Sequence, residues 1–372
     1  MLVGVPGEIK DHEHRVGMTP AGVRELTHRG HAAIVEAGIA DAIGFSDEDY
    51  RRAGAEIVDS ATEIWARAEM VVKVKEPQPA EYPLLRGGQI LFTYLHLAPD
   101  LDQTRALMAA GTIAIAYETV TDDAGRLPLL APMSEIAGRM SIQVGAHCLE
   151  MAQGGRGTLL GGAVGVPAAR VAVLGGGVVG ASAARMALGL EASVAVIDKS
   201  LPRLYDLDQR FGGALETVFA TVDSVERQVL GADLVVGAVL VPGAASPRLV
   251  TRDMVRHMKR GAVMVDVSID QGGCFETSRP TSHAAPVFAV DGVVHYCVTN
   301  MPGAVARTAT QGLGNATLPF VLALADKGWR QALIDDSHLR NGLNVCAGAI
   351  THRAVAAGHG FEHVDPRGAL TG

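Results

Sequence analysis

The feature that most constrains the fold is the glycine-rich stretch GGGVVG at residues 175–180, which matches the pattern G-x-G-x-x-G. The apolar run at 171–174 before it predicts a buried strand, and the small residues at 181–190 after it predict a helix. A second apolar run at 193–197 ends in Asp198, an acid about twenty residues beyond the glycines. Strand, turn, helix and acid in this order predict a Rossmann fold that binds a dinucleotide.

Each glycine of the motif has its own physical task. Gly175 permits the tight turn after the strand, Gly177 lets the backbone approach a pyrophosphate, and Gly180 lets the helix pack against the strand. The N–H groups and partial positive charge at the helix N-terminus favour the phosphates. Asp198 would accept hydrogen bonds from the adenosine ribose and repel a 2′-phosphate, which favours NAD over NADP. Basic residues just beyond Asp198, among them Arg203, weaken that preference.

Short apolar runs alternate with helical segments along most of the chain, which predicts parallel sheets covered by helices. The length of 372 residues corresponds to two domains rather than one. We therefore expect an α/β fold with two doubly wound domains. Strands are expected at 2–5, 32–35, 70–75, 89–95 and 112–117, and then at 171–174, 193–197, 215–219, 233–240 and 262–267; a late helix is expected at 317–327.

A composition change marks the expected border between the two domains. The proline-bracketed stretch LPLLAP at 127–132 breaks the strand–helix alternation, and Ser134 then predicts the N-cap of a long helix that runs to about Met151. A glycine-rich loop without periodicity follows at 154–165. We place a domain hinge in this region.

Composition excludes several classes of protein. With 48% hydrophobic and 19% charged residues the chain is not disordered, and a net charge of −8 argues against a nucleic-acid coat. The longest apolar runs without charge have 14 residues, at 171–184 and 234–247, too short to span a bilayer. No secretory signal is predicted at the N-terminus, and the four cysteines are far apart without metal-ligand spacing. We expect a reduced, cytoplasmic enzyme.

Four polar residues are candidates for chemistry, because α/β sheets gather their active sites beyond the carboxyl ends of strands. Lys75 and His96 end two apolar runs, Asp270 follows a third, and Arg15 lies in a polar loop after the first. A lysine or arginine could bind a substrate carboxylate, and a histidine could act as a general acid or base. The alternatives are a snorkelling lysine, a structural histidine and an ordinary turn aspartate. Lys73 is expected on the same strand face as Lys75, so only one of the two needs to be functional.

Motifs of other enzyme classes are missing from the sequence. It contains no G-x-S-x-G elbow, no G-x-x-x-x-G-K-[ST] loop and no H-E-x-x-H helix motif. Hydrolase, P-loop and zincin interpretations therefore have no support.

The chain resembles the alanine dehydrogenase and transhydrogenase α-subunit superfamily over nearly its whole length. Besides the GGGVVG turn, long matching stretches carry the resemblance: GVPGEIKDHEHRVGMTPAGV (4–23), VVKVKEPQPAEY (71–82), ILFTYLHLAPD (90–100), PLLAPMSEIAGRM (128–140), GAVLVPGAASP (237–247) and MVDVSIDQGGCFETSRPTSH (264–283). Such joint matches are far more specific than any single motif.

The resemblance implies roles for individual residues. It implies that Arg15 and Lys75 bind the substrate carboxylate and carbonyl, that His96 is the catalytic acid or base, and that Asp270 is its partner near the nicotinamide. Positions that match NAD-contacting residues of the family, besides Gly175, Gly177 and Gly180, are Ser134, Val178, Val179, Asp198, Arg203, Val239, Leu240, Val267, Ser268, Ile269, Asp270, Arg279, Val298, Thr299, Asn300 and Met301.

The resemblance also implies an architecture and an assembly. A substrate domain would comprise residues 1–130 and 306–372, an NAD-binding Rossmann domain residues 131–305, and the assembly would be a homohexamer. The sequence departs from the family at Ala220, where many relatives have serine. It also departs at Ala323 and Lys327, where some relatives have an acid and a histidine that bind a divalent metal. No such metal is expected here.

The activity implied by the resemblance is reversible oxidative deamination of L-alanine to pyruvate and ammonium with NAD. Three alternatives remain open at this point. A transhydrogenase α-subunit shares the fold but works with a membrane partner, and an opine or saccharopine-type dehydrogenase condenses an amino acid with a 2-oxo acid. A regulator that binds NAD without catalysis is the third; the presence of all four polar candidates disfavours it.

Overall fold

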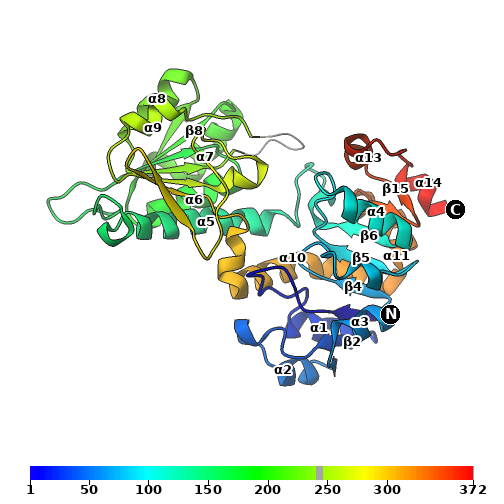
Figure 1. Ribbon diagram of the computed structural model, residues 1–372. Helices are drawn as coiled ribbons and strands as arrows, with labels where there is room; N and C mark the ends of the chain where they lie inside the picture. The colour runs from blue at the N-terminus through cyan, green and yellow to red at the C-terminus, as the bar shows by residue number, and fades with distance from the viewer. Residues whose placement is uncertain (240–245, 372) are drawn as a thin grey trace. The chain divides into compact units, whose positions relative to one another are not determined.

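The computed structural model describes residues 1–239 and 246–371, and Leu240 lies outside the described residues (Figure 1). The chain divides into two compact units, the first made of Met1–Pro132 with Val305–Gly372 and the second of Met133–Ala304. Each unit contains one mostly parallel sheet with helices packed on it, so the α/β fold class is confirmed.

The first unit is built on an eight-stranded sheet with the order β15-β14-β6-β5-β4-β1-β2-β3. The strands β1 to β6 are parallel, whereas β14 pairs antiparallel with both β6 and β15. The strand bounds are β1 Leu2–Val5, β2 Ala32–Glu36, β3 Glu56–Val58, β4 Met70–Val72, β5 Ile90–Thr93, β6 Ile113–Ala116, β14 Leu343–Cys346 and β15 Ala349–Ile350. The helices are α1 Pro20–His28, α2 Asp47–Arg52, α3 Ala61–Arg67, α4 Leu101–Ala110, α10 Ala306–Lys327, α11 Trp329–Asp335, α12 Ser337–Arg340, α13 Arg353–His359 and α14 Pro366–Thr371.

Two expectations for this unit are wrong in detail. The strand predicted at 70–75 ends at Val72, so Lys73 and Lys75 follow β4 instead of sharing one of its faces. The late helix begins at Ala306 rather than at 317, because Gly312 and Gly314 are accommodated inside α10.

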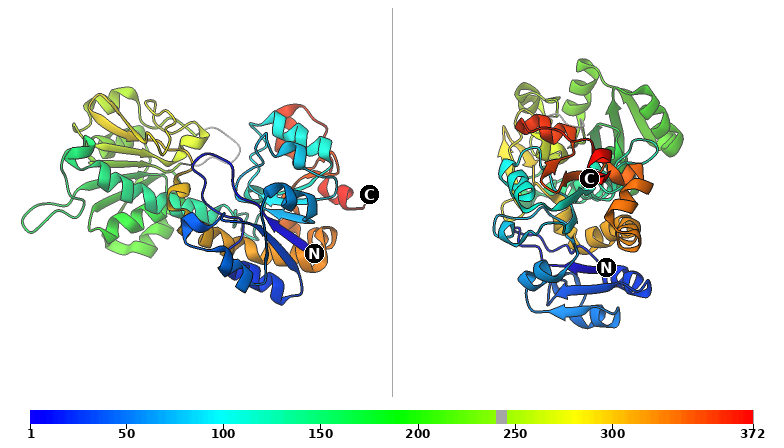
Figure 2. Two further views of the ribbon diagram at one scale, coloured as in Figure 1. Left: turned by 60° about the horizontal axis from the view of Figure 1, so that its bottom comes forward. Right: turned by 90° about the vertical axis from the view of Figure 1, so that its right-hand side faces the viewer.

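The second unit has a seven-stranded sheet with the order β12-β13-β11-β10-β7-β8-β9. Leaving out the antiparallel edge strand β12 and numbering from β7, this is the strand order 3-2-1-4-5-6 of dinucleotide-binding folds. Figure 2 shows this unit in green to yellow from two further sides. The strand bounds are β7 Arg170–Leu174, β8 Ser193–Asp198, β9 Leu215–Phe219, β10 Leu234–Gly237, β11 Val263–Asp266, β12 Val287–Val290 and β13 Val293–Tyr296. The helices are α5 Ala131–Cys148, α6 Val178–Gly189, α7 Leu201–Phe211, α8 Val222–Gly231 and α9 Arg252–His257.

Helices cover both faces of the second sheet: α8 and α9 lie on one side, and α5 and α6 on the other (Figure 1). The core between sheet and α8–α9 is aliphatic, with Val229, Val235 and Val255 fully buried. Helix α5 begins at Ala131, so Ser134 lies in its first turn and is not the predicted N-cap. Pro132 is tolerated there because the first-turn N–H groups of a helix have no intrahelical partner.

Short 3₁₀ helices connect several of these elements: η1 Asp41–Ile43, η2 Tyr82–Leu84, η3 Tyr117–Thr119, η4 Met151–Gln153, η5 Gly212–Ala214, η6 Val267–Gln271 and η7 Met301–Val305. All four cysteines are buried free thiols. Within residues 1–239 and 246–371, no helix combines the length and apolar character needed to cross a membrane. In the same part of the chain no three His, Cys, Asp or Glu side chains gather as a metal site.

Candidate active site

The glycine turn of the second unit has the geometry that its sequence predicts. Gly175 has a φ of +102°, and a Cβ at that position would lie 2.6 Å from the carbonyl oxygen of Ala238. A Cβ on Gly180 would lie 1.8 Å from the Gly175 carbonyl oxygen, so only glycine allows α6 to pack this close. By contrast, a Cβ on Gly177 would meet no protein atom within 4 Å. The space above Gly177 is therefore open to a ligand, as a pyrophosphate would require.

Asp198 is held directly beside this turn. One carboxylate oxygen accepts the Gly176 N–H at 2.7 Å and the other accepts the Ser200 N–H at 2.8 Å. The side chain of Arg203 lies beside the same turn: a Cβ on Gly176 would be 3.0 Å from its Cγ. Helix α6 starts after Gly177 without any side-chain cap, which leaves its first N–H groups to a ligand. The residues present therefore fit NAD, with phosphates at α6 and a ribose at Asp198.

A buried carboxylate shapes the loop that carries Asp270. Asp266 ends β11 and accepts the N–H of Ser268 at 3.1 Å, the N–H of Cys274 at 3.0 Å and the hydroxyl of Ser278 at 2.5 Å. Burial raises the pKa of Asp266, although these hydrogen bonds oppose the rise. Asp270 is exposed in η6 between the two ends of this hydrogen-bonded loop.

The other predicted NAD-contacting residues lie in the second unit, and most of them follow strand ends. Val178 and Val179 form the first turn of α6, Val239 follows β10, and the Ser268 hydroxyl donates to the Val239 carbonyl at 2.7 Å. Residues Val267, Ser268, Ile269 and Asp270 form η6, and Val298, Thr299, Asn300 and Met301 follow β13. Ser134 lies on α5, and Arg279 places its guanidinium 4.1 Å from the centre of the Phe288 ring.

The first unit contains a dense group of acids and bases after β1 and β4. The Arg15 Nε donates to Glu13 Oε1 at 2.7 Å, and both side chains are buried. Lys10 pairs with Glu76, a contact between two partly exposed side chains.

Lys73 forms a second, deeper ion-pair group after β4. Its Nζ lies 2.8 Å from Glu81 and 3.3 Å from Glu8, and none of the three side chains is more than 5% exposed. Burial disfavours the charged form, but the two carboxylates outweigh it and raise the pKa of Lys73. Lys73 is therefore a structural cation, and it is not available to a substrate.

Lys75 differs from the other cations of this group. Across the residues that the structure describes, it forms no ion pair with a carboxylate, whereas Lys10, Arg15 and Lys73 each have at least one such partner. Burial and the positive charge of Arg15 lower the pKa of Lys75. The half-buried ammonium beside a guanidinium makes a positive site that fits a substrate carboxylate.

His96 follows β5, the strand that pairs with β4, so its backbone is close to the segment that carries Lys75. It adopts a left-handed conformation with φ of +50°, and Glu118 accepts its N–H at 2.7 Å and that of Leu95 at 3.2 Å. The same carboxylate oxygen lies 3.9 Å from Nδ1 of His96. The imidazole stacks on the ring of Tyr94 with centroids 5.8 Å apart and is 48% exposed, so a substrate can reach it.

Comparison with known proteins identifies the family of the chain. Residues 4–137 match the family model described as alanine dehydrogenase/PNT, N-terminal domain, and residues 141–353 match that of the C-terminal domain. The chain belongs to the alanine dehydrogenase family. It is 60% identical to alanine dehydrogenase of Halomonas elongata over 98% of both chains. It is 55% identical to that of Mycolicibacterium smegmatis over 96% of both chains.

Solved structures of the family superpose on nearly the whole chain. An L-alanine dehydrogenase with 52% identity gives a TM-score of 0.94 and covers 96% of this chain and 99% of its own. A transhydrogenase from Sinorhizobium meliloti with 25% identity gives 0.82 and covers 95% of this chain and 100% of its own. The family's NAD-binding domain is thus the second unit with its glycine turn.

Sequence reasoning missed several residues that shape the sites of this alanine dehydrogenase family member. Three of them are carboxylates: Glu8 accepts the N–H of Lys75, Glu13 pairs with the side chain of Arg15, and Glu118 accepts the N–H of His96. The other two are Tyr94, which stacks on His96, and Asp266, which holds the loop of Asp270. Two of the five had a local signal: Asp266 is the acid at the carboxyl end of the apolar strand VMVD (263–266), and Glu118 directly follows the strand predicted at 112–117. The others act on partners that are distant in the sequence or give no local pattern.

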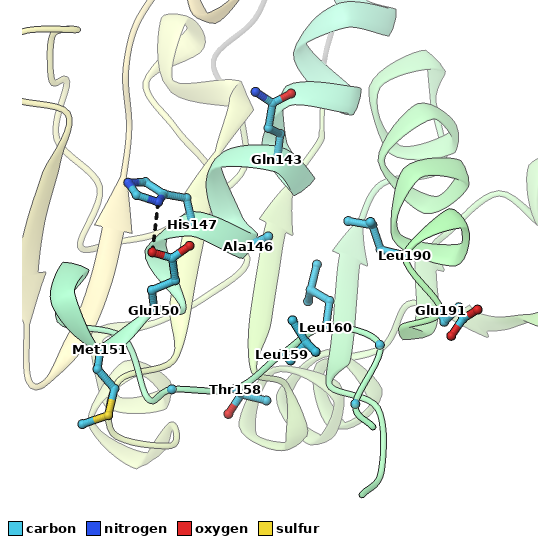
Figure 3. Close-up of a pocket in the computed structure, with 13 residues that line it drawn as sticks. Gln143, Ala146, His147, Glu150, Met151, Thr158, Leu159, Leu160, Leu190 and Glu191 are labelled. Atoms are coloured by element: carbon cyan, nitrogen blue, oxygen red, sulfur yellow. Dashed lines mark ion pairs between the residues drawn. The ribbon is translucent and has the colours of Figure 1, made fainter. Parts of the chain in front are cut away.

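A separate pocket of about 740 Å³ lies in the second unit and contains none of the predicted site residues (Figure 3). It is lined by the end of α5 and by residues that precede β7 and β8, among them Leu159, Leu160 and Leu190. On its wall, Nδ1 of His147 lies 3.4 Å from a carboxylate oxygen of Glu150. This pocket adjoins the amino ends of β7 and β8, the sheet edge opposite the glycine turn.

Proposed function

We propose that this protein catalyses the NAD-dependent, reversible oxidative deamination of L-alanine to pyruvate and ammonium. The observation that carries the proposal is the Lys75 ammonium, which is half-buried beside Arg15 while the neighbouring acids are taken by other bases. A half-buried cation without a carboxylate partner lowers the stability of the fold. A role in binding an anionic substrate would account for its presence.

In this proposal Arg15 and Lys75 bind the carboxylate and carbonyl oxygens of pyruvate and the carboxylate of alanine. Glu13 already compensates the charge of Arg15, so Lys75 supplies the positive charge that the substrate neutralises. Arg15 supplies a rigid fork that fixes the orientation of the carboxylate.

His96 would move protons to and from the substrate nitrogen and the water that adds to the carbon. Its accessible ring, stacked on Tyr94 and anchored through Glu118, suits a general acid or base. Asp270 would orient the water or the amine and stabilise developing positive charge. Asp270 belongs to the second unit and His96 to the first, so their partnership stays a prediction.

The second unit would hold NAD through the glycine turn, the N-terminus of α6 and Asp198. When bound, NAD would supply the hydride chemistry of the reaction in both directions. The chain's own contribution is to fix the substrate and to move the protons.

We further propose that the protein is a cytoplasmic homohexamer, which rests on its membership of the family. Sedimentation analysis of the purified protein tests this assembly, and a monomer or dimer at micromolar concentration would contradict it.

The activity is tested in both directions: by NADH formation from NAD with L-alanine alone, and by NADH consumption with pyruvate supplied either with ammonium or with an amino acid. We expect turnover with alanine alone and NADH-dependent consumption of pyruvate only with ammonium. A strict requirement for a second carbon substrate would identify an opine or saccharopine-type dehydrogenase instead. Binding of NAD without any turnover would support a transhydrogenase-like subunit or a regulator.

A further inference from the structure

The segment that presents Lys75 is bordered on one side by a strand and on the other by a single carboxylate. Lys73 donates its N–H to the Phe92 carbonyl at 3.2 Å, and Tyr94 donates to the Val74 carbonyl at 3.3 Å, so this segment continues along β5 beyond the end of β4. On the other side, β1 pairs with β4 only through residues 3–4 and 70–71. The backbone N–H groups beyond that pairing need another acceptor.

Glu8 is that acceptor. Its Oε1 accepts the N–H of Val74 at 2.6 Å and that of Lys75 at 3.3 Å, while Oε2 lies 3.3 Å from the Lys73 ammonium. The Glu8 side chain is 2% exposed, so water does not compete for these bonds. One buried carboxylate thus takes the place of a neighbouring strand and fixes the backbone from which the Lys75 side chain extends.

We propose that Glu8 is a positioning residue for substrate binding, which acts by bracing the backbone of Lys75. It touches neither substrate nor cofactor in this proposal, which rests on the proposed role of Lys75 in binding the substrate carboxylate. Removing its charge loosens residues 74 and 75 and displaces the ammonium from the position that the carboxylate requires. The loss is therefore in affinity for pyruvate and alanine, not in affinity for NADH.

Glu81 provides a matched control within the same cluster. It also pairs with Lys73, at 2.8 Å, it is also buried, and its other oxygen also accepts a backbone N–H, that of Gln78 at 2.8 Å. Glu81 makes no hydrogen bond to the backbone of Val74 or Lys75 within the described residues. Glu8→Gln and Glu81→Gln each remove one carboxylate from Lys73, but only Glu8→Gln weakens the brace on Lys75.

The test compares full-length wild type, Glu8→Gln and Glu81→Gln by steady-state kinetics and thermal unfolding. Both variants should unfold at lower temperatures than wild type. Glu8→Gln should raise the KM for pyruvate by about 10- to 100-fold, the scale of losses from small misplacements, with the KM for NADH unchanged. Glu81→Gln should leave both KM values close to wild type. An unchanged pyruvate KM in Glu8→Gln, or an equal rise in both variants, would overturn the proposal.

A second measurement keeps the test independent of turnover and of folding yield. Limited acylation with acetic anhydride, read by peptide mass spectrometry, should modify Lys75 several-fold faster in Glu8→Gln than in wild type or Glu81→Gln, with Lys10 as the internal reference. If Glu8→Gln does not fold, Glu8→Asp carries the same test, because it keeps the charge but shortens the reach to the two N–H groups. If wild type lacks activity with alanine and pyruvate, the proposed function fails, and the acylation of Lys75 alone then decides whether Glu8 braces it.

Discussion

Replacing Lys73 by methionine should lower the thermal stability of the protein, whereas replacing Lys75 by methionine should weaken substrate binding. The two residues are only two positions apart. Lys73 is fully buried between Glu8 and Glu81, with Nζ–O distances of 3.3 and 2.8 Å. Lys75 is half-buried, has no carboxylate partner among the described residues, and has a pKa lowered by burial and by Arg15. Methionine preserves most of the length and the apolar stem of lysine in both cases.

The expected magnitudes follow from these surroundings. Removing one partner of a buried ion pair costs about 3–5 kcal/mol, because the remaining charge stays buried without compensation. For a unit of this size each kcal/mol corresponds to about 2–4 °C, so Lys73→Met should lower the Tm by roughly 6–20 °C. Lys75→Met removes a cation that destabilises the unliganded fold, so its Tm should equal or exceed that of wild type. It should also lose a charge-assisted bond of about 1.5–3 kcal/mol to the substrate, which raises the KM for pyruvate by about 10- to 150-fold.

The assay is NADH-dependent amination of pyruvate at saturating ammonium, together with thermal unfolding followed by circular dichroism. Titration of NADH by its fluorescence checks that the cofactor site of each variant is intact. A Tm of Lys75→Met as low as that of Lys73→Met would show that Lys75 is a second structural lysine. A normal pyruvate KM in Lys75→Met would refute its assignment as the substrate's electrostatic anchor.

Four other predictions address the remaining residues. His96→Ala should lower turnover by about two to four powers of ten with NADH affinity retained, and near-normal turnover would make the residue structural. Asp198→Gly should raise the NADP-to-NAD ratio of catalytic efficiency, while NAD use also weakens because Gly176 and Ser200 lose their acceptor; an unchanged ratio would place Asp198 away from the ribose. Gly177→Ala should weaken NADH binding at a normal Tm, whereas Gly180→Ala should lower the Tm, since of the two only the methyl at Gly180 would meet backbone. Calorimetry measures the Tm and fluorescence titration measures NADH binding. Because the pKa of Lys75 lies below its ordinary value of 10.5, the ammonium is lost as the pH rises through that lowered value; the pyruvate KM should rise there in wild type and stay flat in Lys75→Met.

The NAD-binding half of the molecule was predictable because its decisive features are local. The turn at 175–180 needs glycine for reasons of backbone conformation and close packing, and the strand before it, the helix after it and Asp198 follow within one βαβ unit. Position alone also made Lys75 and His96 candidates, since the ends of neighbouring parallel strands meet at one edge of a sheet, and their roles stay predictions.

Other parts of the fold had no local signal. The strand β3 has only three residues, and β14 and β15 join the first sheet as an antiparallel edge after a return of the chain from the second unit. Periodicity over so few residues does not separate a strand from a loop. The start of α10 at Ala306 was missed because Gly312 and Gly314 lower its helix propensity, which the packing of the helix overrides.

The sequence by itself determined that the chain contains a Rossmann unit, where its dinucleotide turn lies, and which charged side chains are available at strand ends. The residue pattern left open which of two nearby lysines is structural, and only the tertiary structure showed that Lys73 is paired with two carboxylates while Lys75 has no carboxylate partner among the described residues. The reason is that the free energy of a buried charge depends on the carboxylates around it, and Glu8 and Glu81 reach Lys73 from segments outside β4. Spacing along the chain carries no information about such partners; they are brought together by the packing of the first unit.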